Sequence, residues 1–292
     1  PAQRLPTLNS LQFMIGLLGS WAATKPTEWM LRVLDWRELY LLFAGITVFA
    51  ALLMVVVTPR HDAPGSSETL KQQLQGLLQI YTDAYFWRIA PWMFVSMAVA
   101  QALNTLYVYS WLTDVAVFSA SGAATGISLV TLVSAVNFMA LGPLAEKLSK
   151  QGHSALLVPV VGQLLAMIML ALLALQVPIA VVPQWMVWTV VAGTSTLAFS
   201  AFSQAFPTGM IGRVFTAFNL LGFLATALFQ WLVGRMLDSY PRGADGAVAA
   251  QGYADAFYLL LAIQLTAALW FALATHFKLG SRTLLQIKEG SS

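Results

Sequence analysis

Few side chains in this sequence are suited to acid–base, nucleophilic or metal chemistry. Histidine occurs only at His61, His153 and His276, each in a loop or at the end of an apolar run, and cysteine is absent. The sequence contains no His-Glu-x-x-His motif for zinc, and TGMIGR, residues 208–213, has too few glycines for a phosphate-binding loop. We therefore expect neither an enzyme nor a bound metal or cofactor.

A second group of side chains is suited to binding a solute by hydrogen bonds. These residues are uncharged and polar and lie inside long apolar runs, where water does not satisfy them. The candidates are Gln101, Asn104, Tyr107, Ser134, Asn137, Thr194, Thr196 and Asn219. For any single residue the alternative is a hydrogen bond between two helices, worth about 0.6 kcal/mol in a membrane. As a group we expect them to line a cavity, with Gln101, Asn104 and Asn137 as the main contacts.

No Asp or Glu lies deep in any of these apolar runs. A proton relay through a membrane needs a titratable group at such a depth. This sequence therefore gives no support for proton coupling or for a fixed partner of a cationic solute. A neutral or weakly polar solute fits best, and an anion bound by residues outside this sequence stays an alternative.

The composition explains where these residues must lie. Of the 292 residues, 59% are hydrophobic and 9% are charged, whereas soluble proteins carry about 25% charged residues. A helix needs about 20 apolar residues to cross the lipid core. The runs that meet this need are 9–28, 39–57, 89–112, 124–145, 155–176, 183–206, 214–233 and 256–275. The sequence thus predicts an all-α membrane protein with eight crossings, and its scattered basic residues do not indicate nucleic-acid binding.

Residues 58–86 form the one long polar segment between two of these runs. The segment starts with TPRHDAPGSS, which reads as a linker, and continues into a helix that begins at Ser66 or Ser67. One face of this helix would carry Leu70, Leu74, Leu77, Leu78 and Tyr81. We expect the helix to lie along the membrane surface, with a partner-binding helix as the alternative. The side that holds this segment carries most Lys and Arg residues, which places it in the cytoplasm.

Residues 9–28 and 219–238 align without gaps. The alignment pairs Trp21 with Trp231 and places a base and an acid, spaced three residues apart, at the end of both segments. These residues are Lys25 with Glu28, and Arg235 with Asp238. We expect structural ion pairs at this spacing, although a charge at membrane depth is also a candidate contact for substrate. Two parallel halves of a transporter would produce this repeat.

Between residues 115 and 212, all Asp, Glu, Lys and Arg residues lie within GPLAEKLSKQGHS, residues 142–154. We expect this segment to form a short cytoplasmic loop. Its front, residues 142–147, matches the loop signature Gly-x-x-x-Asp-Arg/Lys-x-Gly-Arg-Arg of the major facilitator superfamily, whereas its rear lacks the basic pair. Residues 207–238, PTGMIGRVFTAFNLLGFLATALFQWLVGRMLD, are similar to the tenth and eleventh spans of bacterial members. The sequence resembles this family over nearly its whole length.

The resemblance implies a fold of two six-helix bundles joined by a central loop. Only two runs precede the central loop here, so we expect a fragment equivalent to spans five to twelve, with a naturally shortened protein as the alternative. The expected parts are residues 1–58 from the first half, the linker 59–86, the six-helix bundle 87–278 and a cytoplasmic tail, 279–292. In the family, the acid of the loop signature lies near the start of the eleventh span. This predicts a cytoplasmic latch of Gly142, Glu146, Lys147 and Arg213, and ordinary loop charge is the alternative.

The resemblance also implies function. We expect a secondary carrier that moves a small-molecule solute by alternating access between two helical bundles. It would be a multi-pass protein of the bacterial inner membrane, with both termini of this chain in the cytoplasm. Its partners would be the lipid bilayer, the solute and the missing first spans. A receptor or scaffold on the same fold is the first alternative, and a membrane-embedded enzyme is the second.

Overall fold

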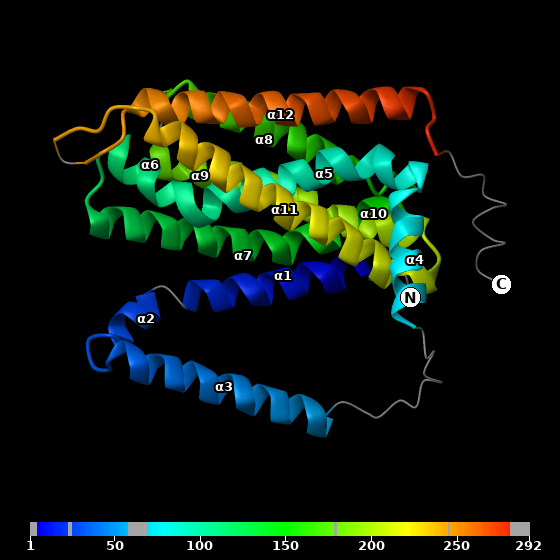
Figure 1. Cartoon of the computed structure of the whole chain (residues 1–292), viewed down its shortest axis with the longest axis horizontal. Coiled ribbons are helices and arrows are strands. Elements are labelled where there is room, and N and C mark those ends of the chain that lie inside the picture. Colours follow the sequence, from blue (N-terminus) through cyan, green and yellow to red (C-terminus); the bar gives the residue numbers. More distant parts are fainter. Residues whose placement is uncertain (1–4, 23–24, 58–68, 178–179, 245, 281–292) are drawn as a thin grey trace.

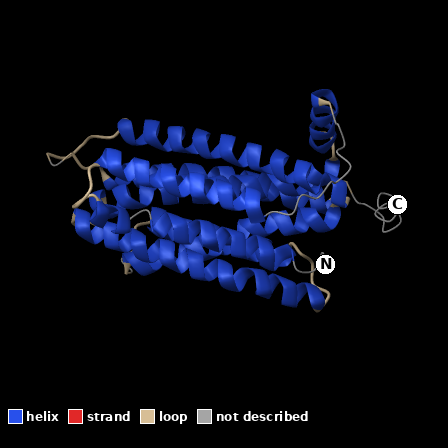
Figure 2. Ribbon diagram, turned by 90° about the horizontal axis from the view of Figure 1, so that it is seen from below, coloured by secondary structure: helices blue, strands red, loops and turns tan. Residues whose placement is uncertain are grey.

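The computed structural model describes residues 5–22, 25–57, 69–177, 180–244 and 246–280, and in these ranges the chain is mostly helical (Figure 1). Most helices run along one common direction, and loops join them at the two ends (Figure 2). The helices are α1 (Leu5–Ala22), α2 (Lys25–Met30), α3 (Trp36–Val57), α4 (Leu70–Tyr81), α5 (Ala84–Ala102), η2 (Leu103–Tyr107), α6 (Val108–Asp114), α7 (Ala120–Lys150), α8 (Leu157–Ala174), α9 (Val181–Ala192), η3 (Gly193–Leu197), α10 (Ala198–Ala205), η4 (Thr208–Met210), α11 (Ile211–Asp238) and α12 (Ala250–His276).

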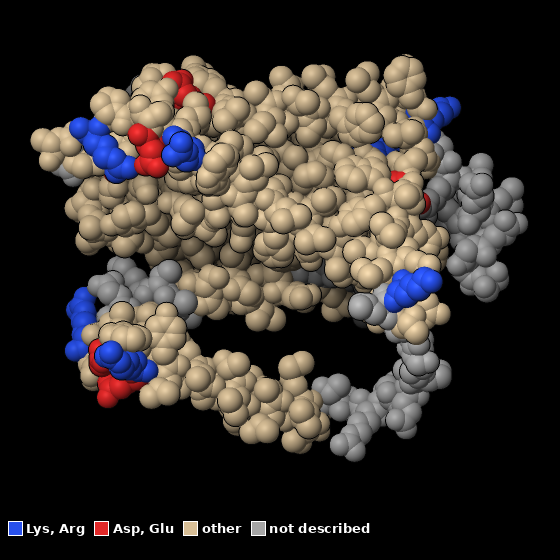
Figure 3. All heavy atoms as spheres, in the orientation of Figure 1, with Lys and Arg blue, Asp and Glu red and all other residues tan. Residues whose placement is uncertain are grey.

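Within the described ranges, seven helical segments are long and apolar enough to cross a membrane. They are α3, α5 to α6, α7, α8, α9 to α10, α11 and α12. Figure 3 supports this interpretation, because on the face shown the charged side chains gather at the two ends and leave an uncharged band between them. The all-α membrane fold is therefore confirmed.

The first expected crossing, 9–28, differs from the structure. Helix α1 ends at Ala22 and a separate short helix, α2, begins at Lys25. The apolar part of α1, Leu11–Trp21, is shorter than the other crossings. Pro26 explains the break, because a proline cannot donate the backbone hydrogen bond that would continue a helix from upstream but fits the first turn of a new one.

The bundle is built around α5, which packs against α11 and α12. Helix α8 packs against α9 and α12, and α1 packs chiefly against α7. Fully buried aromatic side chains fill the centre, among them Trp185, Phe202 and Phe257. Helix α3 lies apart from this core (Figure 1), and almost all of its apolar side chains are exposed. That arrangement suits a helix whose neighbours are lipid tails.

Helix α4 begins later than expected. Its N-cap is Thr69, whose side chain accepts from the backbone of Gln72 while the Gln72 side chain accepts from the backbone of Thr69. The helix lies across one end of the bundle (Figure 1) and contacts α11 and α5. Its predicted apolar face is divided, because Leu74 and Leu78 are exposed whereas Leu77 packs against the core.

The charged segment at residues 142–154 also differs from its prediction. Helix α7 continues through Pro143 to Lys150, so Glu146, Lys147 and Lys150 occupy its last turns instead of a loop. Two basic residues in the last turn interact favourably with the helix dipole. The Nζ atom of Lys150 donates to Oε1 of Glu146 at 2.8 Å, the favourable order for an acid and a base four residues apart.

Candidate functional site

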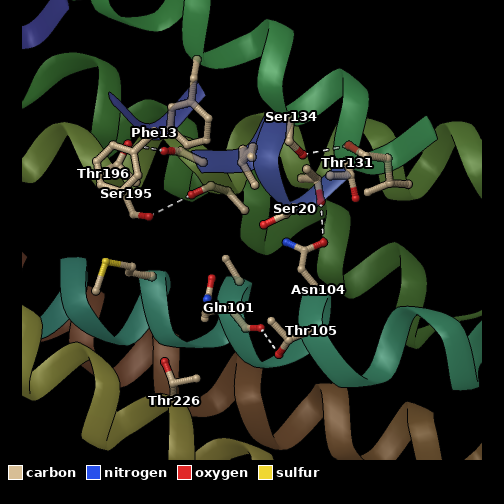
Figure 4. Close-up of a pocket in the computed structure, with 18 of the residues that line it drawn as sticks. Phe13, Ser20, Gln101, Asn104, Thr105, Thr131, Ser134, Ser195, Thr196 and Thr226 are labelled. Atoms are coloured by element: carbon tan, nitrogen blue, oxygen red, sulfur yellow. Dashed lines mark hydrogen bonds between the residues drawn. The ribbon is translucent and has the colours of Figure 1, made fainter. Parts of the chain in front are cut away.

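A cavity of about 340 Å³ lies between α1, α5, η2, α7, η3 and α11. Figure 4 shows it as a space between two groups of side chains. One group contains Phe13, Ser20, Ser134 and Thr196, and the other contains Gln101 and Thr226. The volume falls within the range of about 300–1,000 Å³ that is typical of small-molecule pockets.

Two interrupted helices form much of the wall. The span from α5 to α6 contains a π-helical turn, η2, and the span from α9 to α10 contains a 3₁₀ turn, η3. In η3, Thr194, Ser195 and Thr196 each donate a side-chain hydrogen bond to the carbonyl three residues earlier. Such local bonds compete with the regular helical ladder. π-turns occur frequently at functional sites, and both interruptions face the cavity.

Hydrogen bonds join η2 to α9 and to α11. The Oγ1 atom of Thr189, one turn before η3, donates to Oδ1 of Asn104 in η2 at 2.9 Å. Gln230 of α11 holds η2 twice, because its Nε2 donates to Oγ1 of Thr105 at 2.9 Å and its carbonyl accepts from the hydroxyl of Tyr107 at 2.5 Å. The turn η2 is thus held in position by α9 and α11.

The structure divides the predicted cavity residues into two groups. The residues that line the cavity are Gln101, Asn104, Ser134, Thr196 and Asn219. The other three form links between helices. The Nδ2 atom of Asn137 donates to the carbonyl of Val190 at 2.9 Å, Tyr107 contacts α11 as described above, and Thr194 accepts from Nε2 of Gln163 at 2.9 Å. Asn137, predicted as a main contact, thus lies outside the lining.

Several lining residues were absent from the sequence prediction. They are Ser20, Thr105, Thr131, Thr189, Ser195 and Thr226, with the aromatic residues Phe13, Phe138 and Phe223. Helical spacing could have identified some of them, because residues three or four positions apart share one face. Thr105 follows Gln101 by four positions, and Thr131 precedes Ser134 by three. Phe13 and Ser20 carry no such signal, since they reach the cavity from α1.

Every residue that lines the cavity in the described part of the chain is uncharged. The apolar side chains include Met97, Leu17 and Val130, and the polar ones are amides and hydroxyls. Among the described residues, no group of three or more His, Cys, Asp or Glu is arranged to hold a metal ion. The site is therefore suited to binding by hydrogen bonds and apolar contact.

Two of the predicted latch residues have other neighbours in this conformation. Glu146 pairs with Lys150 at the end of α7. The side chain of Arg213 instead lies over Gly76 of α4, where an added Cβ would meet its Cδ and Nε atoms at 2.8 Å. Gly142 is buried in α7, and Lys147 is exposed.

The two predicted structural pairs have different outcomes. The side chains of Lys25 and Glu28 lie outside the described residues. Asp238 forms an ion pair with Arg242, with Oδ1 and NH2 separated by 3.1 Å, and Arg235 is exposed. Arg242, four residues after Asp238, therefore forms the ion pair that the sequence predicted for Arg235.

The end of the bundle opposite α4 has polar contacts of its own. One carboxylate oxygen of Asp114, at the end of α6, accepts from the Tyr253 hydroxyl at 2.8 Å and from the Val248 backbone at 3.2 Å. In the same region the Tyr240 hydroxyl donates to Asp255, and this hydrogen bond raises the pKa of Tyr240. These contacts tie the loop between α11 and α12 to the end of α6 and to the start of α12.

Apolar helices of spanning length around an uncharged polar cavity define a multi-pass membrane protein of the transport class. The sequence model of the Major Facilitator Superfamily matches residues 2–230. The chain belongs to this family and is a membrane transporter. The comparison with curated proteins finds no match.

Proposed function

We propose that the protein is a secondary carrier that moves a small solute through the cavity by alternating access. The observation that carries this proposal is the position of the cavity between a six-helix bundle, residues 87–278, and α1, which belongs to the segment before the linker. Transporter sites lie at such boundaries between moving parts, near the middle of the membrane and beside interrupted helices. The cavity lies between α1 and the bundle and beside the interrupted helices η2 and η3, which supports the proposal.

The contact between α1 and the bundle is the expected moving interface. Phe13 of α1 stacks on Phe138 of α7 with ring centroids 5.5 Å apart. Nearer the other end of α1, Nε1 of Trp21 donates to Oγ of Ser128 at 3.0 Å. A contact made largely of apolar packing can separate at either end without leaving many buried polar groups unpaired.

The proposal is tested by flux through the purified protein in proteoliposomes. The vesicles are incubated with a mixture of small metabolites, and their contents are identified by mass spectrometry. We expect at least one metabolite to enter faster than into protein-free vesicles. The variant Ser20→Trp fills the cavity from α1 and should reduce this entry at least about tenfold, because it removes the space for the solute.

Ile15→Trp is the matched control for this variant. Ile15 is exposed on α1 and does not line the cavity, so this variant should leave the flux within about twofold of the original protein. If no metabolite enters faster than into protein-free vesicles, the carrier proposal fails. A receptor or scaffold on the same fold, the main alternative, would give that result.

We also propose that the end carrying α4 faces the cytoplasm, because most Lys and Arg residues lie on that side. Glu146 and Arg213 lie at this end, and we propose that the latch between them holds the outward-facing state and breaks as the bundles rock. Glu146→Gln should then lower the flux several-fold without reducing expression. Lys150→Gln removes only the pair seen within α7 and should have little effect. Equal effects of both variants would contradict the latch.

A further inference from the structure

The hydroxyl groups around the cavity have a common orientation. The Oγ atoms of Ser134, Ser195 and Thr196 lie 2.8, 3.0 and 2.8 Å from backbone carbonyl oxygens of their own helices. A carbonyl oxygen only accepts hydrogen bonds, so each hydroxyl must donate its single hydrogen to the backbone. Each of these side chains therefore has only lone pairs left to offer a solute.

The same holds for further hydroxyls on the opposite wall and beside η3. Thr226 donates to the carbonyl of Gly222 at 2.8 Å, and Thr189 donates to Oδ1 of Asn104 at 2.9 Å. Thr105 donates to the carbonyl of Gln101 at 2.7 Å and also accepts from Gln230. The part of the wall formed by these six residues is consequently rich in acceptors and poor in hydroxyl donors.

Amide groups supply the donors that remain. Because Oδ1 of Asn104 already accepts from Thr189, its Nδ2 is the atom available to a solute. In Figure 4 this nitrogen points into the space between η2 and Ser20. The side chain of Gln101, on the same wall, makes no hydrogen bond to the described residues and offers both a donor and an acceptor.

The remainder of the wall is apolar and neutral. Phe13, Phe138 and Phe223 supply aromatic surface, and no lining residue in the described ranges carries a charge. Moving an ionised group from water into such a site without an opposite charge is strongly unfavourable. The lining thus selects against both anions and cations, and it favours a molecule with one apolar face.

We infer that the cavity takes an uncharged solute that carries O–H or N–H donors along one edge and an apolar surface on the other. Its donors meet the hydroxyl oxygens, and an acceptor on the same edge meets the amide of Asn104. This inference rests on the proposed carrier function, because it assumes that the cavity is the solute site. It adds the chemical class of the solute to that proposal.

The absence of cysteine from the sequence permits a direct test. Thr131→Cys places a single thiol on the cavity wall, and Val117→Cys places one in a loop where Val117 is 83% exposed. Both purified full-length variants are treated with four methanethiosulfonates. These carry a neutral hydroxyethyl, a neutral ethyl, an anionic sulfonatoethyl or a cationic aminoethyl group. Each rate at the cavity is divided by the rate of the same reagent at residue 117.

The hydroxyethyl reagent should react with the cavity thiol at least about tenfold faster than either charged reagent, on this relative scale. It should also react several-fold faster than the ethyl reagent, because only the hydroxyethyl group brings an O–H donor to the acceptor-rich wall. Ser134→Cys provides a second position on the same wall should Thr131→Cys fold poorly.

The possible outcomes separate the two proposals. A cavity thiol that reacts with none of the reagents, while residue 117 reacts with all, would show a site closed to solutes and would count against the carrier function itself. Reaction of a charged reagent as fast as the hydroxyethyl reagent would overturn the uncharged class alone. A faster reaction of the ethyl reagent would overturn the requirement for donors.

Discussion

Polar residues in the spans of this protein perform two different tasks, and their hydrogen bonds distinguish them. Asn104 and Asn137 are the same residue type, and both lie inside membrane-spanning segments. Asn104 shares its oxygen with Thr189 and keeps its nitrogen for the cavity, whereas Asn137 uses its nitrogen to join α7 to the carbonyl of Val190 in α9. The first arrangement leaves a donor for the proposed solute, and the second joins two helices of the bundle.

Substitution by leucine should separate these tasks. Asn104→Leu should reduce, without abolishing, the preference of the cavity thiol for the hydroxyethyl over the ethyl reagent, because the amide donor to the reagent's hydroxyl oxygen is lost while the acceptors of the wall remain. It also removes the hydrogen bond from Thr189 and should lower stability by about 0.6 kcal/mol. Asn137→Leu should preserve the preference and lower stability by about 0.6 kcal/mol, the typical worth of such a hydrogen bond in a membrane. The measurements are thiol reaction rates and thermal unfolding in detergent, and the reverse pattern would contradict this assignment.

At the scale of the elements, the interrupted helices depend on close approach of their neighbours. Gly162 of α8 lies directly against Thr194 of η3, where an added Cβ would be 2.6 Å from Cγ2 and 2.7 Å from Cβ of Thr194. The threonine is short, branched and held by Gln163, so it cannot move aside. The glycine therefore permits α8 to support the 3₁₀ turn.

Gly162→Ala should destabilise the protein by about 1–3 kcal/mol, as overpacking of a close contact does. Gly222→Ala is the matched control, because the added Cβ would meet only the terminal methyl group of Met97, the far end of a flexible side chain. Its effect should be below about 1 kcal/mol. Thermal unfolding of the two variants in the same detergent checks the difference, and equal losses of stability would contradict this role of Gly162.

For the molecule as a whole, the proposed carrier mechanism depends on whether α1 moves relative to the bundle. Helix α1 contributes Phe13, Leu17 and Ser20 to the cavity and packs chiefly against α7. If the two parts rock about the cavity, the contact between Trp21 and Ser128 must open during each cycle. A fixed α1 would keep the cavity closed at that end.

A covalent link across this contact tests the motion. In the double variant Trp21→Cys and Ser128→Cys, a short bis-methanethiosulfonate should join the two thiols and reduce solute flux at least about tenfold. A reducing agent should restore it, and each single variant should remain insensitive to the reagent. Unchanged flux in the linked protein would show that α1 and α7 move together and that another interface opens.

The sequence by itself determined the fold class, because the cost of placing unpaired backbone and charge in lipid forces apolar runs into helices and charge to their ends. That argument located seven crossings in the described part, and it identified five lining residues, Gln101, Asn104, Ser134, Thr196 and Asn219. Helix ends were less certain. The runs alone did not show that α1 stops at Ala22 or that α7 extends to Lys150.

Only the tertiary structure decided which polar residues share the cavity. Tyr107 and Asn137 are polar and lie in spans like the lining residues, yet their partners on neighbouring helices occupy them. Which polar residues face the cavity depends on the rotation of each helix about its axis and on the turns η2 and η3. Packing between segments that are distant in the sequence sets the rotation and the turns. A periodic apolar sequence leaves that rotation open, because hydrophobicity alone does not distinguish lipid from the apolar interior of a bundle.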